Sequence, residues 1–398
     1  MLRTGFNNAR VRQTNKQVFL GHLWREKQLS KSRLAQITGL SIPAVSNILQ
    51  ELLDEGRITH SRENLSQRGL NSGSFQIPTD GAWLLCMNVS PTHISSQLAD
   101  SRLLPIGDVQ HETISAPQPT ALISAIAAHW RRYRKQHPQA IINLALGVHG
   151  QVDPVTGVSQ TMPQAPWKAP LEIRYLLEEQ LGIQVRLDND CVMLALAEKW
   201  QNPAALADFC VINVDYGIGS SFVINDRIWR GSLYGSGQIG HTIINPDGMA
   251  CDCGRYGCLE TVASLSALKK QARIWLKSRP GNQSLDPDNL TTAQLIDAWR
   301  RGEGPVRAWV ENAASAIGLS LYNFLNILNI NQIWLYGRSC AFGEPWLNTI
   351  IRQTGFNPFD HGDTPKIKAT QIGFGQLTPG QQLLGSGYLY VEALLSEV

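Results

Sequence analysis

The sequence predicts an α/β protein with an N-terminal winged helix–turn–helix followed by a two-lobed domain. A run with helical spacing and one turn glycine occupies residues 15–57. Strand-like apolar runs then alternate with helical stretches from residue 83 onward. A chain of 398 residues is also too long for one ordinary core. We therefore expect a head at 1–80 and a larger domain at 81–398.

The composition is that of an ordinary globular protein, with 43% hydrophobic and 17% charged residues. No apolar run reaches the 18 or more residues that a membrane span requires. The first ten residues lack the apolar core of a secretory signal. These features predict a cytoplasmic protein that does not bind a membrane.

Charge is distributed unevenly along the chain. Residues 1–70 hold 11 Lys and Arg against 5 Asp and Glu, whereas the remainder holds 24 basic and 27 acidic residues. A basic head on a mildly acidic body indicates that the head meets a polyanion. Charge alone is equally compatible with a basic soluble surface, so the residue pattern has to decide.

The pattern in the head is that of a helix–turn–helix. A first helix would bury Val18, Phe19, Leu23 and Trp24. Ser30 or Ser32 can cap a short second helix, which Gly39 ends by adopting a left-handed turn. A third helix at 42–55, capped by Ser41, places apolar residues on one face and small or polar residues on the other.

That polar face is suited to reading base edges in the major groove. Residues 57–76 are expected to form two short strands with a basic turn, a wing that contacts phosphates or a narrow minor groove. Lys31 and Arg33 are expected to contact phosphates. The predicted DNA-binding residues are Lys31, Arg33, Ser41, Ala44, Ser46, Asn47, Gln50, Arg62 and Arg68. The alternative is a small helical bundle without a DNA role, which the polar face and the basic wing disfavour.

A Ser-, Gly- and Asn-rich linker is expected near 69–81. Beyond it, the alternation of strands and helices predicts a largely parallel sheet in two lobes, with ligands in a cleft beyond the strand ends. The predicted strands are 83–89, 94–99, 142–148, 185–187, 209–214 and 333–336, and the predicted helices are 120–136, 171–181, 192–201 and 306–328.

Three of the seven cysteines fall within eight residues, at Cys251, Cys253 and Cys258. Two thiolates spaced Cys-x-Cys can share one metal, and Gly254 and Gly257 allow tight turns between ligands. His241 is the natural fourth ligand. A Cys3His tetrahedron is typical of a structural zinc site, closed to substrate. The alternative is a chance cluster of buried free thiols.

A second polar group, Asn189-Asp190, follows a predicted strand and precedes a helix. A carboxylate there could accept a proton from a hydroxyl group. An Asn-Asp pair at a strand end is more often a helix cap than a catalytic base.

Together these features resemble the ROK family, which groups bacterial sugar kinases with sugar-responsive repressors. The resemblance rests on Gly147-x-x-Gly150, Asn189-Asp190, Gly217-x-Gly219, Ile239-Gly-His241 and the cysteine run ending at Glu260. It covers nearly the whole chain and implies an actin-like, sugar-kinase-like fold for the larger domain. The helix–turn–helix places the chain in the repressor branch, similar to repressors of amino-sugar and glucose metabolism.

The resemblance implies roles for individual residues. Asp190 matches the base of the kinases, here expected to be vestigial, so no catalytic residue is assigned. Asn189, Asp190, Gln238, His241 and Glu260 are expected to hold the sugar ring. Gln238 departs from the family's glutamate, and its amide carries no charge.

A further departure concerns the nucleotide. Kinases of the family begin this domain with an Asp-x-Gly-x-Thr phosphate loop, whereas this chain has Asn88-Val-Ser-Pro-Thr92. Asn88 lacks the charge that helps to hold Mg²⁺, and Pro91 has no amide donor. Residues 336–339 likewise replace consecutive glycines near the adenosine site. ATP binding is therefore expected to be lost.

The function expected from these features is DNA-binding repression of carbohydrate genes, controlled by a sugar or sugar phosphate. A homodimer or homotetramer would pair the heads on an operator. Two alternatives stay open. One is an active sugar kinase with a DNA-binding head, since Asp190 is present; the other is a repressor switched by a partner protein.

Overall fold

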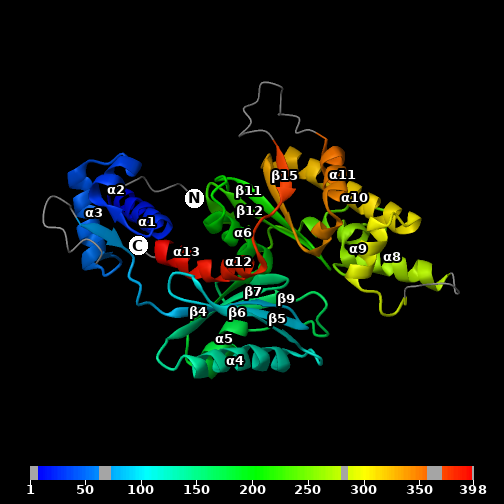
Figure 1. Ribbon diagram of the computed structural model, residues 1–398, viewed down its shortest axis with the longest axis horizontal. Helices are drawn as coiled ribbons and strands as arrows, with labels where there is room; N and C mark the ends of the chain where they lie inside the picture. Colours follow the sequence, from blue (N-terminus) through cyan, green and yellow to red (C-terminus); the bar gives the residue numbers. More distant parts are fainter. Residues whose placement is uncertain (1–7, 62–72, 279–285, 356–369, 397–398) are drawn as a thin grey trace.

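The computed structural model of the protein describes residues 8–61, 73–278, 286–355 and 370–396. It contains a small head, which lies beside a body of two lobes (Figure 1). The head comprises α1 (Asn8–Glu26), β1 (Leu29–Ser30), α2 (Lys31–Thr38), α3 (Ile42–Asp54), β2 (Thr59–His60) and β3 (Ser74–Gln76). Its three strands pair in the order β1-β3-β2, so the winged helix–turn–helix expected from the sequence is present.

The head differs from expectation in three details. Helix α1 begins at Asn8 rather than near residue 15, and it buries Leu20 in place of Val18, which is 41% exposed. Strand β3 is the second of the two short strands expected within 57–76, but it also occupies part of the expected linker at 69–81. The alternating apolar residues Phe75 and Ile77 explain this, because both are buried in the head core.

The first lobe is built on a five-stranded sheet, in the order β10-β7-β4-β5-β6. The three strands β4, β7 and β10 run parallel, while β5 and β6 are antiparallel additions. One face is covered by α4 and α5. The elements are β4 (Trp83–Val89), β5 (His93–Ala99), β6 (Pro105–Thr113), α4 (Pro119–Gln136), β7 (Ile142–Val148), β8 (Gln151–Asp153), β9 (Val158–Thr161), α5 (Ile173–Leu181) and β10 (Val185–Asn189).

The second lobe repeats this topology around the order β13-β12-β11-β14-β15, with α7 to α11 on one face. Its elements are β11 (Phe209–Val214), β12 (Ile218–Ile224), β13 (Arg227–Trp229), the 3-10 turn η2 (Ile239–His241), α7 (Glu260–Ala263), α8 (Leu265–Lys277), α9 (Thr292–Arg300), α10 (Gly304–Leu328), β14 (Gln332–Tyr336), the turn η3 (Arg338–Phe342), α11 (Glu344–Thr354) and β15 (Gln371–Phe374). Such duplication of an α/β lobe is the two-lobed architecture predicted above.

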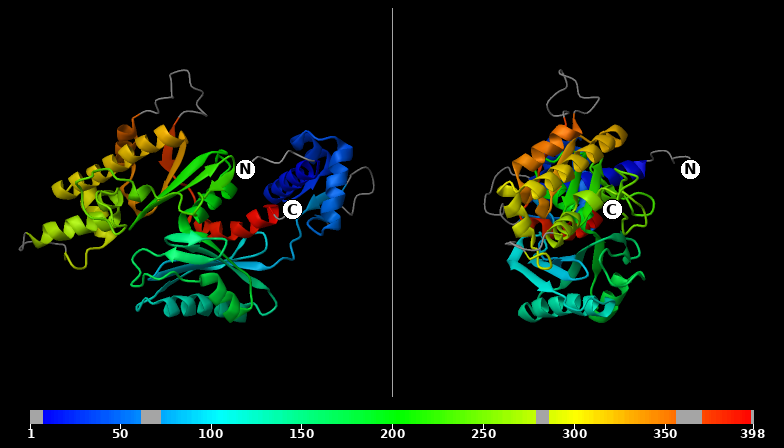
Figure 2. Two further views of the ribbon diagram at one scale, coloured as in Figure 1. Left: turned by 180° about the vertical axis from the view of Figure 1, so that it is seen from behind. Right: turned by 90° about the vertical axis from the view of Figure 1, so that its right-hand side faces the viewer.

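Helix α6 (Asp190–Gln201) lies between the two sheets and contacts strands of both. The chain then returns to the first lobe through α12 (Pro379–Leu384), the turn η4 (Gly385–Gly387) and α13 (Tyr388–Ser396). Helix α13, drawn in red, runs from the centre of the body to the blue head (Figure 2). Among the described residues, no helix is long and apolar enough to cross a membrane.

Candidate functional site

The turn between α2 and α3 is formed as the sequence predicts. The hydroxyl of Ser30 accepts a hydrogen bond from the amide of Arg33, and Gly39 ends α2 with φ of 69°. Ser41 caps α3 by accepting from the amide of Ala44. Since Ser30 has this role, the alternative cap Ser32 is not needed.

The predicted DNA-binding residues that the structure describes lie on α2, on α3 or at their caps. Ser41, Asn47, Gln50 and Arg33 are exposed, while Lys31, Ala44 and Ser46 are half-buried. The side chains of Ser46 and Gln50 bond within their own helix, to the Ile42 carbonyl and the Asp54 carboxylate. Arg62 and Arg68 lie outside the described residues. The DNA contacts themselves stay a prediction.

Two further basic residues of the head form ion pairs within the head. Arg12 and Lys16 of α1 form ion pairs with Glu51 of α3, and Lys16 also pairs with Glu55. These contacts hold α1 against the C-terminal half of α3. None of these ion pairs involves Asn47, which lies in the N-terminal half of α3 and is exposed.

The predicted metal ligands converge. One ligand atom from each of His241, Cys251, Cys253 and Cys258 lies within 4.8 Å of the others. The Sγ atoms of Cys253 and Cys258 are 3.6 Å apart, and Cys251 Sγ is 3.5 Å from His241 Nδ1. Ligands at about 2.3 Å from a tetrahedral zinc ion are separated by about 3.8 Å. The four side chains therefore fit a structural zinc ion.

The backbone around this cluster depends on glycine. Gly254 and Gly257 have φ of 86° and 67°, and a side chain at Gly257 would collide with the carbonyl oxygen of Asn245. Burial and the two neighbouring thiols raise the pKa of Cys258 to about 12. Because a metal ligand has to be the thiolate, a bound cation is what would keep this thiol ionised.

The Asn189-Asp190 pair has a divided role. Asn189 caps α6 by accepting from the amides of Cys191 and Val192, and its Nδ2 donates to the carbonyl of Gly150 at 2.6 Å. Its side chain is thus occupied by structural bonds. Asp190 is the residue of the pair whose carboxylate lines a cavity between the lobes.

His149 is a site residue that the sequence analysis missed. Its Nδ1 lies 3.2 Å from Oδ2 of Asp190, at the end of β7. Burial by itself would lower the pKa of His149, but the hydrogen bond and charge of Asp190, together with Glu260 and Asp215, raise it overall. The signal was its position inside the motif Gly147-x-x-Gly150.

The second lobe supplies the other predicted sugar ligands. Oε2 of Glu260 accepts a hydrogen bond from the amide of Ile218 at 2.9 Å, which fixes the carboxylate beside Gly217. Gln238 is exposed on the preceding loop, and His241 follows it in η2. If His241 binds a metal through Nδ1, its Nε2 is left for a sugar hydroxyl.

An ion pair that was not predicted ties the lobes together. Nε of Arg230, which follows β13, lies 2.7 Å from Oδ2 of Asp188 on β10. The Asp188 side chain is only 3% exposed, so its charge depends on this partner. The carbonyl of Leu233, on the same loop, accepts from Gln151 Nε2. This loop leads to Gln238 and is thereby held against the first lobe.

The two segments that were expected to have lost their contacts with ATP, 88–92 and 336–339, are held by bonds within the chain. The amide and the hydroxyl of Ser90 both donate to the carbonyl of His93, which closes the turn after β4. On the other lobe, Arg338 pairs with Asp215 at 2.9 Å and lies over the Tyr216 ring at 4.2 Å. These contacts take up groups that could otherwise meet a nucleotide.

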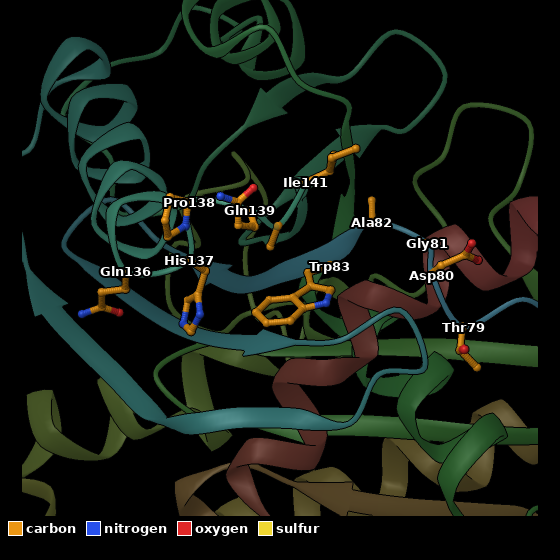
Figure 3. Close-up of a pocket in the computed structure, with 11 residues that line it drawn as sticks. Thr79, Asp80, Gly81, Ala82, Trp83, Gln136, His137, Pro138, Gln139 and Ile141 are labelled. Atoms are coloured by element: carbon orange, nitrogen blue, oxygen red, sulfur yellow. The ribbon is translucent and has the colours of Figure 1, made fainter.

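Two hollows bear on the site. A cavity of about 190 Å³ lies between the lobes and includes Asp190, Asn88 and Asn213. A wider hollow of about 540 Å³ lies at the outer end of the first lobe, where residues 79–83 leave the head (Figure 3). There the rings of Trp83 and His137 are 5.1 Å apart. None of the predicted site residues that the structure describes lines this outer hollow, whereas Asp190 lines the cavity between the lobes, which is therefore the candidate for part of the ligand site. Asn189, Gln238, His241 and Glu260 line neither hollow.

Comparison with known proteins identifies the family. The family model described as "ROK family" matches residues 85–361, which is well over half of the chain. The chain belongs to the ROK family.

Relatives of this ROK protein extend over its head as well as its body. It is 66% identical, over the full length of both chains, to a protein of Escherichia coli K12 called "Uncharacterized protein YphH". It is 24% identical to the "Xylose repressor" of Caldicellulosiruptor bescii, with 88% of this chain and 90% of the relative covered.

Solved structures share the fold. A ROK family transcriptional regulator, described as a homologue of the E. coli MLC protein, matches with a TM-score of 0.76 at 20% identity, covering 96% of this chain and 97% of the other. A ROK glucokinase from Streptomyces griseus, solved with glucose and AMPPNP, matches with a TM-score of 0.66 at 20% identity. It covers 77% of this chain and 99% of its own. The regulator includes the head, whereas the kinase matches the body alone.

Proposed function

We propose that this ROK protein is a DNA-binding transcriptional regulator, a repressor of carbohydrate-metabolism genes, that responds to a sugar bound at Asp190 and does not transfer phosphate. The observation that carries the proposal is the pairing of two features. The head exposes polar residues in the N-terminal half of α3. In the body, the carboxylates of Asp190 and Glu260, which are proposed to hold the sugar, are present, whereas Arg338 on the proposed nucleotide side pairs with Asp215.

Helix α6 is the proposed route from the sugar to the head. Asp190 is its first residue, and Lys199 and Trp200 lie at its far end, about 15 Å away. There Lys199 Nζ and Trp200 Nε1 both donate to Oε1 of Glu392 on α13, at 2.8 and 2.9 Å. A shift of α6 on sugar binding would therefore move α13.

Helix α13 in turn packs against the head. Leu394 and Leu395 pack against the head core, and Trp24 of α1 contacts both that core and the cluster beneath α13. Arg25 of α1 lies over the Trp200 ring at 5.0 Å. A sugar would change DNA affinity if it favoured one arrangement of these contacts over the other.

The contacts at Trp200 give the first test of this route. Trp200→Ala should leave operator affinity within a few-fold of the wild type but reduce the sugar-induced change in that affinity, because α6 loses the Trp200 hydrogen bond to Glu392 and the contact with Arg25, and keeps only the Lys199 bond to Glu392. The matched control is Trp229→Ala, at an exposed tryptophan of β13. A full sugar response in the Trp200 variant would contradict the proposed route.

Two heads are needed to bind the two half-sites of an operator, so we propose a homodimer or homotetramer. Exposed apolar side chains on the outer face of α10 offer a surface for pairing, namely Leu319, Tyr322, Ile327 and Leu328. The role at DNA also implies a cytoplasmic location. A zinc ion at the Cys3His cluster would stabilise the segment that carries His241 and Glu260.

DNA binding is tested at α3. Asn47→Ala removes an exposed amide of the kind that reads adenine, so operator affinity should fall by about 5- to 150-fold. The measurement is a gel-shift or anisotropy titration with inverted-repeat DNA from the protein's own genomic neighbourhood. Asn348→Ala, at an exposed asparagine of α11, is the matched control. Failure of the wild type to bind any such DNA would overturn the function.

A sugar kinase remains the second candidate, because Asp190 is present in the cleft. A coupled assay with hexoses and Mg-ATP distinguishes the two, since kinases turn over roughly 1–100 times per second. Turnover at that rate would replace the regulator with an enzyme. If instead neither sugar nor ATP binds, while DNA binding persists, a partner protein becomes the signal.

A further inference from the structure

We propose that the cavity beside Asp190 is a second sugar subsite that takes a neutral, hydroxyl-rich group, so that the effector is an unphosphorylated sugar larger than a monosaccharide. The proposal rests on the proposed function, because it concerns the ligand of the same cleft. It is carried by the residues that line the cavity and by the charges that they lack.

The cavity lies on the nucleotide side of Asp190 and is formed by both lobes. Its volume of about 190 Å³ is below the 300–1,000 Å³ that is typical of a complete ligand site, which fits a subsite. Its polar side chains come from β4, β5, β6, α6, β11, α12 and η4, namely Asn88, Ser95, His111, Asp190, Asn213, Gln382 and Ser386.

Among the residues that the structure describes, no lysine or arginine lines this cavity, and His111 is the one basic side chain of the lining. The Nδ1 atom of His111 is already paired with the hydroxyl of Ser95 at 2.9 Å. Across the cleft, Arg338 is held by Asp215. A phosphate bound here would lie beside the Asp190 carboxylate without a lysine or arginine to offset its charge. The lining therefore disfavours both a nucleotide phosphate and a sugar phosphate.

The same lining suits hydroxyl groups. Asn88 of β4 and Asn213 of β11 belong to opposite lobes, and among the described residues neither side-chain amide has a hydrogen bond within the chain. Each amide can donate and accept, which matches adjacent hydroxyls that do both. Met87, Met193 and Leu194 add apolar surface for the carbon face of a ring.

Because Asn88 and Asn213 come from different lobes, a ligand that bonds to both is satisfied only when the lobes are close together. The subsite would then favour the closed arrangement more strongly than a ring bound at Asp190 alone. Under this proposal, the second sugar ring makes the ligand bind more tightly when the two lobes are close together than when they are apart.

The test is calorimetry on the full-length protein with matched probes. These are glucose, glucose 6-phosphate, maltose and cellobiose; xylose and xylobiose; and N-acetylglucosamine, its 6-phosphate and chitobiose. We expect one disaccharide to bind at least about tenfold more tightly than its monosaccharide, and each phosphate ester to bind more weakly than its parent sugar. A phosphate ester that binds most tightly would overturn the subsite while leaving sugar-responsive regulation intact.

Variants separate the subsite from the ring site. Asn213→Ala should remove the disaccharide's advantage and change monosaccharide affinity by less than about twofold, whereas Asn348→Ala on α11 should change neither. Asn88→Lys adds a cation and should improve phosphate-ester binding by about tenfold. An advantage that persists in both Asn213→Ala and Asn88→Ala would overturn the proposal. If no probe binds the wild type, sugar control itself is wrong, and the subsite with it.

Discussion

The cysteine cluster and the region around Ser90 and Arg338 differ in whether their polar groups are available to a ligand. On one side, the cysteine cluster brings four ligand atoms within 4.8 Å and has glycines where its turns need them. On the other, the turn at Ser90 and the Arg338–Asp215 pair use their polar groups internally. The comparison teaches that the polar groups of one cluster can be left together for a ligand while those of another are taken up by internal bonds.

The largest expected effect comes from removing one of the four proposed metal ligands. Cys258→Ser removes a buried ligand and should abolish stoichiometric zinc, with the melting temperature falling by about 10 °C or more, because metal binding contributes to folding. Metal analysis and thermal unfolding measure both. The matched control is Cys340→Ser, at a half-buried cysteine outside the cluster. Full stability without metal would show that the cluster is only a group of thiols.

A smaller effect is expected at the ion pair that joins the two lobes. Arg230→Met leaves the buried Asp188 without its partner and should lower the free energy of unfolding by about 3 kcal/mol. Arg227→Met, three residues earlier and exposed, should be close to neutral. Denaturant titration compares the variants. Equal stability would mean that the loop carrying Gln238 is held by other contacts.

The smallest expected effect is a pH dependence at His149. The pKa of His149 is raised in the folded protein by the Asp190 carboxylate. The attraction between protonated His149 and Asp190 therefore stabilises the folded protein at pH values below the pKa that His149 has in the unfolded chain. That contribution is lost as the pH rises through the folded pKa. The melting temperature of the wild type should exceed that of His149→Gln by more at pH 5.5 than at pH 8.5. A difference that grows with pH would contradict the assigned ion pair.

The features that the sequence predicted well are local ones. Ser30, Gly39 and Ser41 determine the helix–turn–helix through contacts within a few residues, and the cysteine run determines its cluster in the same way. Apolar spacing placed six strands of the two main sheets, whereas β6, β12, β13 and β15 were not predicted, and three of these four run antiparallel to their neighbours. The choice between Val18 and Leu20 in α1 was missed, because both fit a helical face and α13 helps to decide which is buried.

Features formed by distant segments could not be predicted. Nothing near Asp188 in the chain indicates Arg230, and nothing near Asp190 indicates His149 across forty-one residues. The residue ranges 1–80 and 81–398 were predicted as separate domains, but Leu394 and Leu395 pack against the head core. Pairings of this kind depend on the three-dimensional topology, which local patterns do not contain.

The packing of Leu394 and Leu395 on the head has a consequence for synthesis. The head core is built mainly from residues 19–77, yet part of its apolar surface stays uncovered until the distant helix α13 has been made. A chain without α13 would thus carry α3 on an incompletely packed support. Under the proposed function, such a chain should bind its operator more weakly than one in which α13 covers the head.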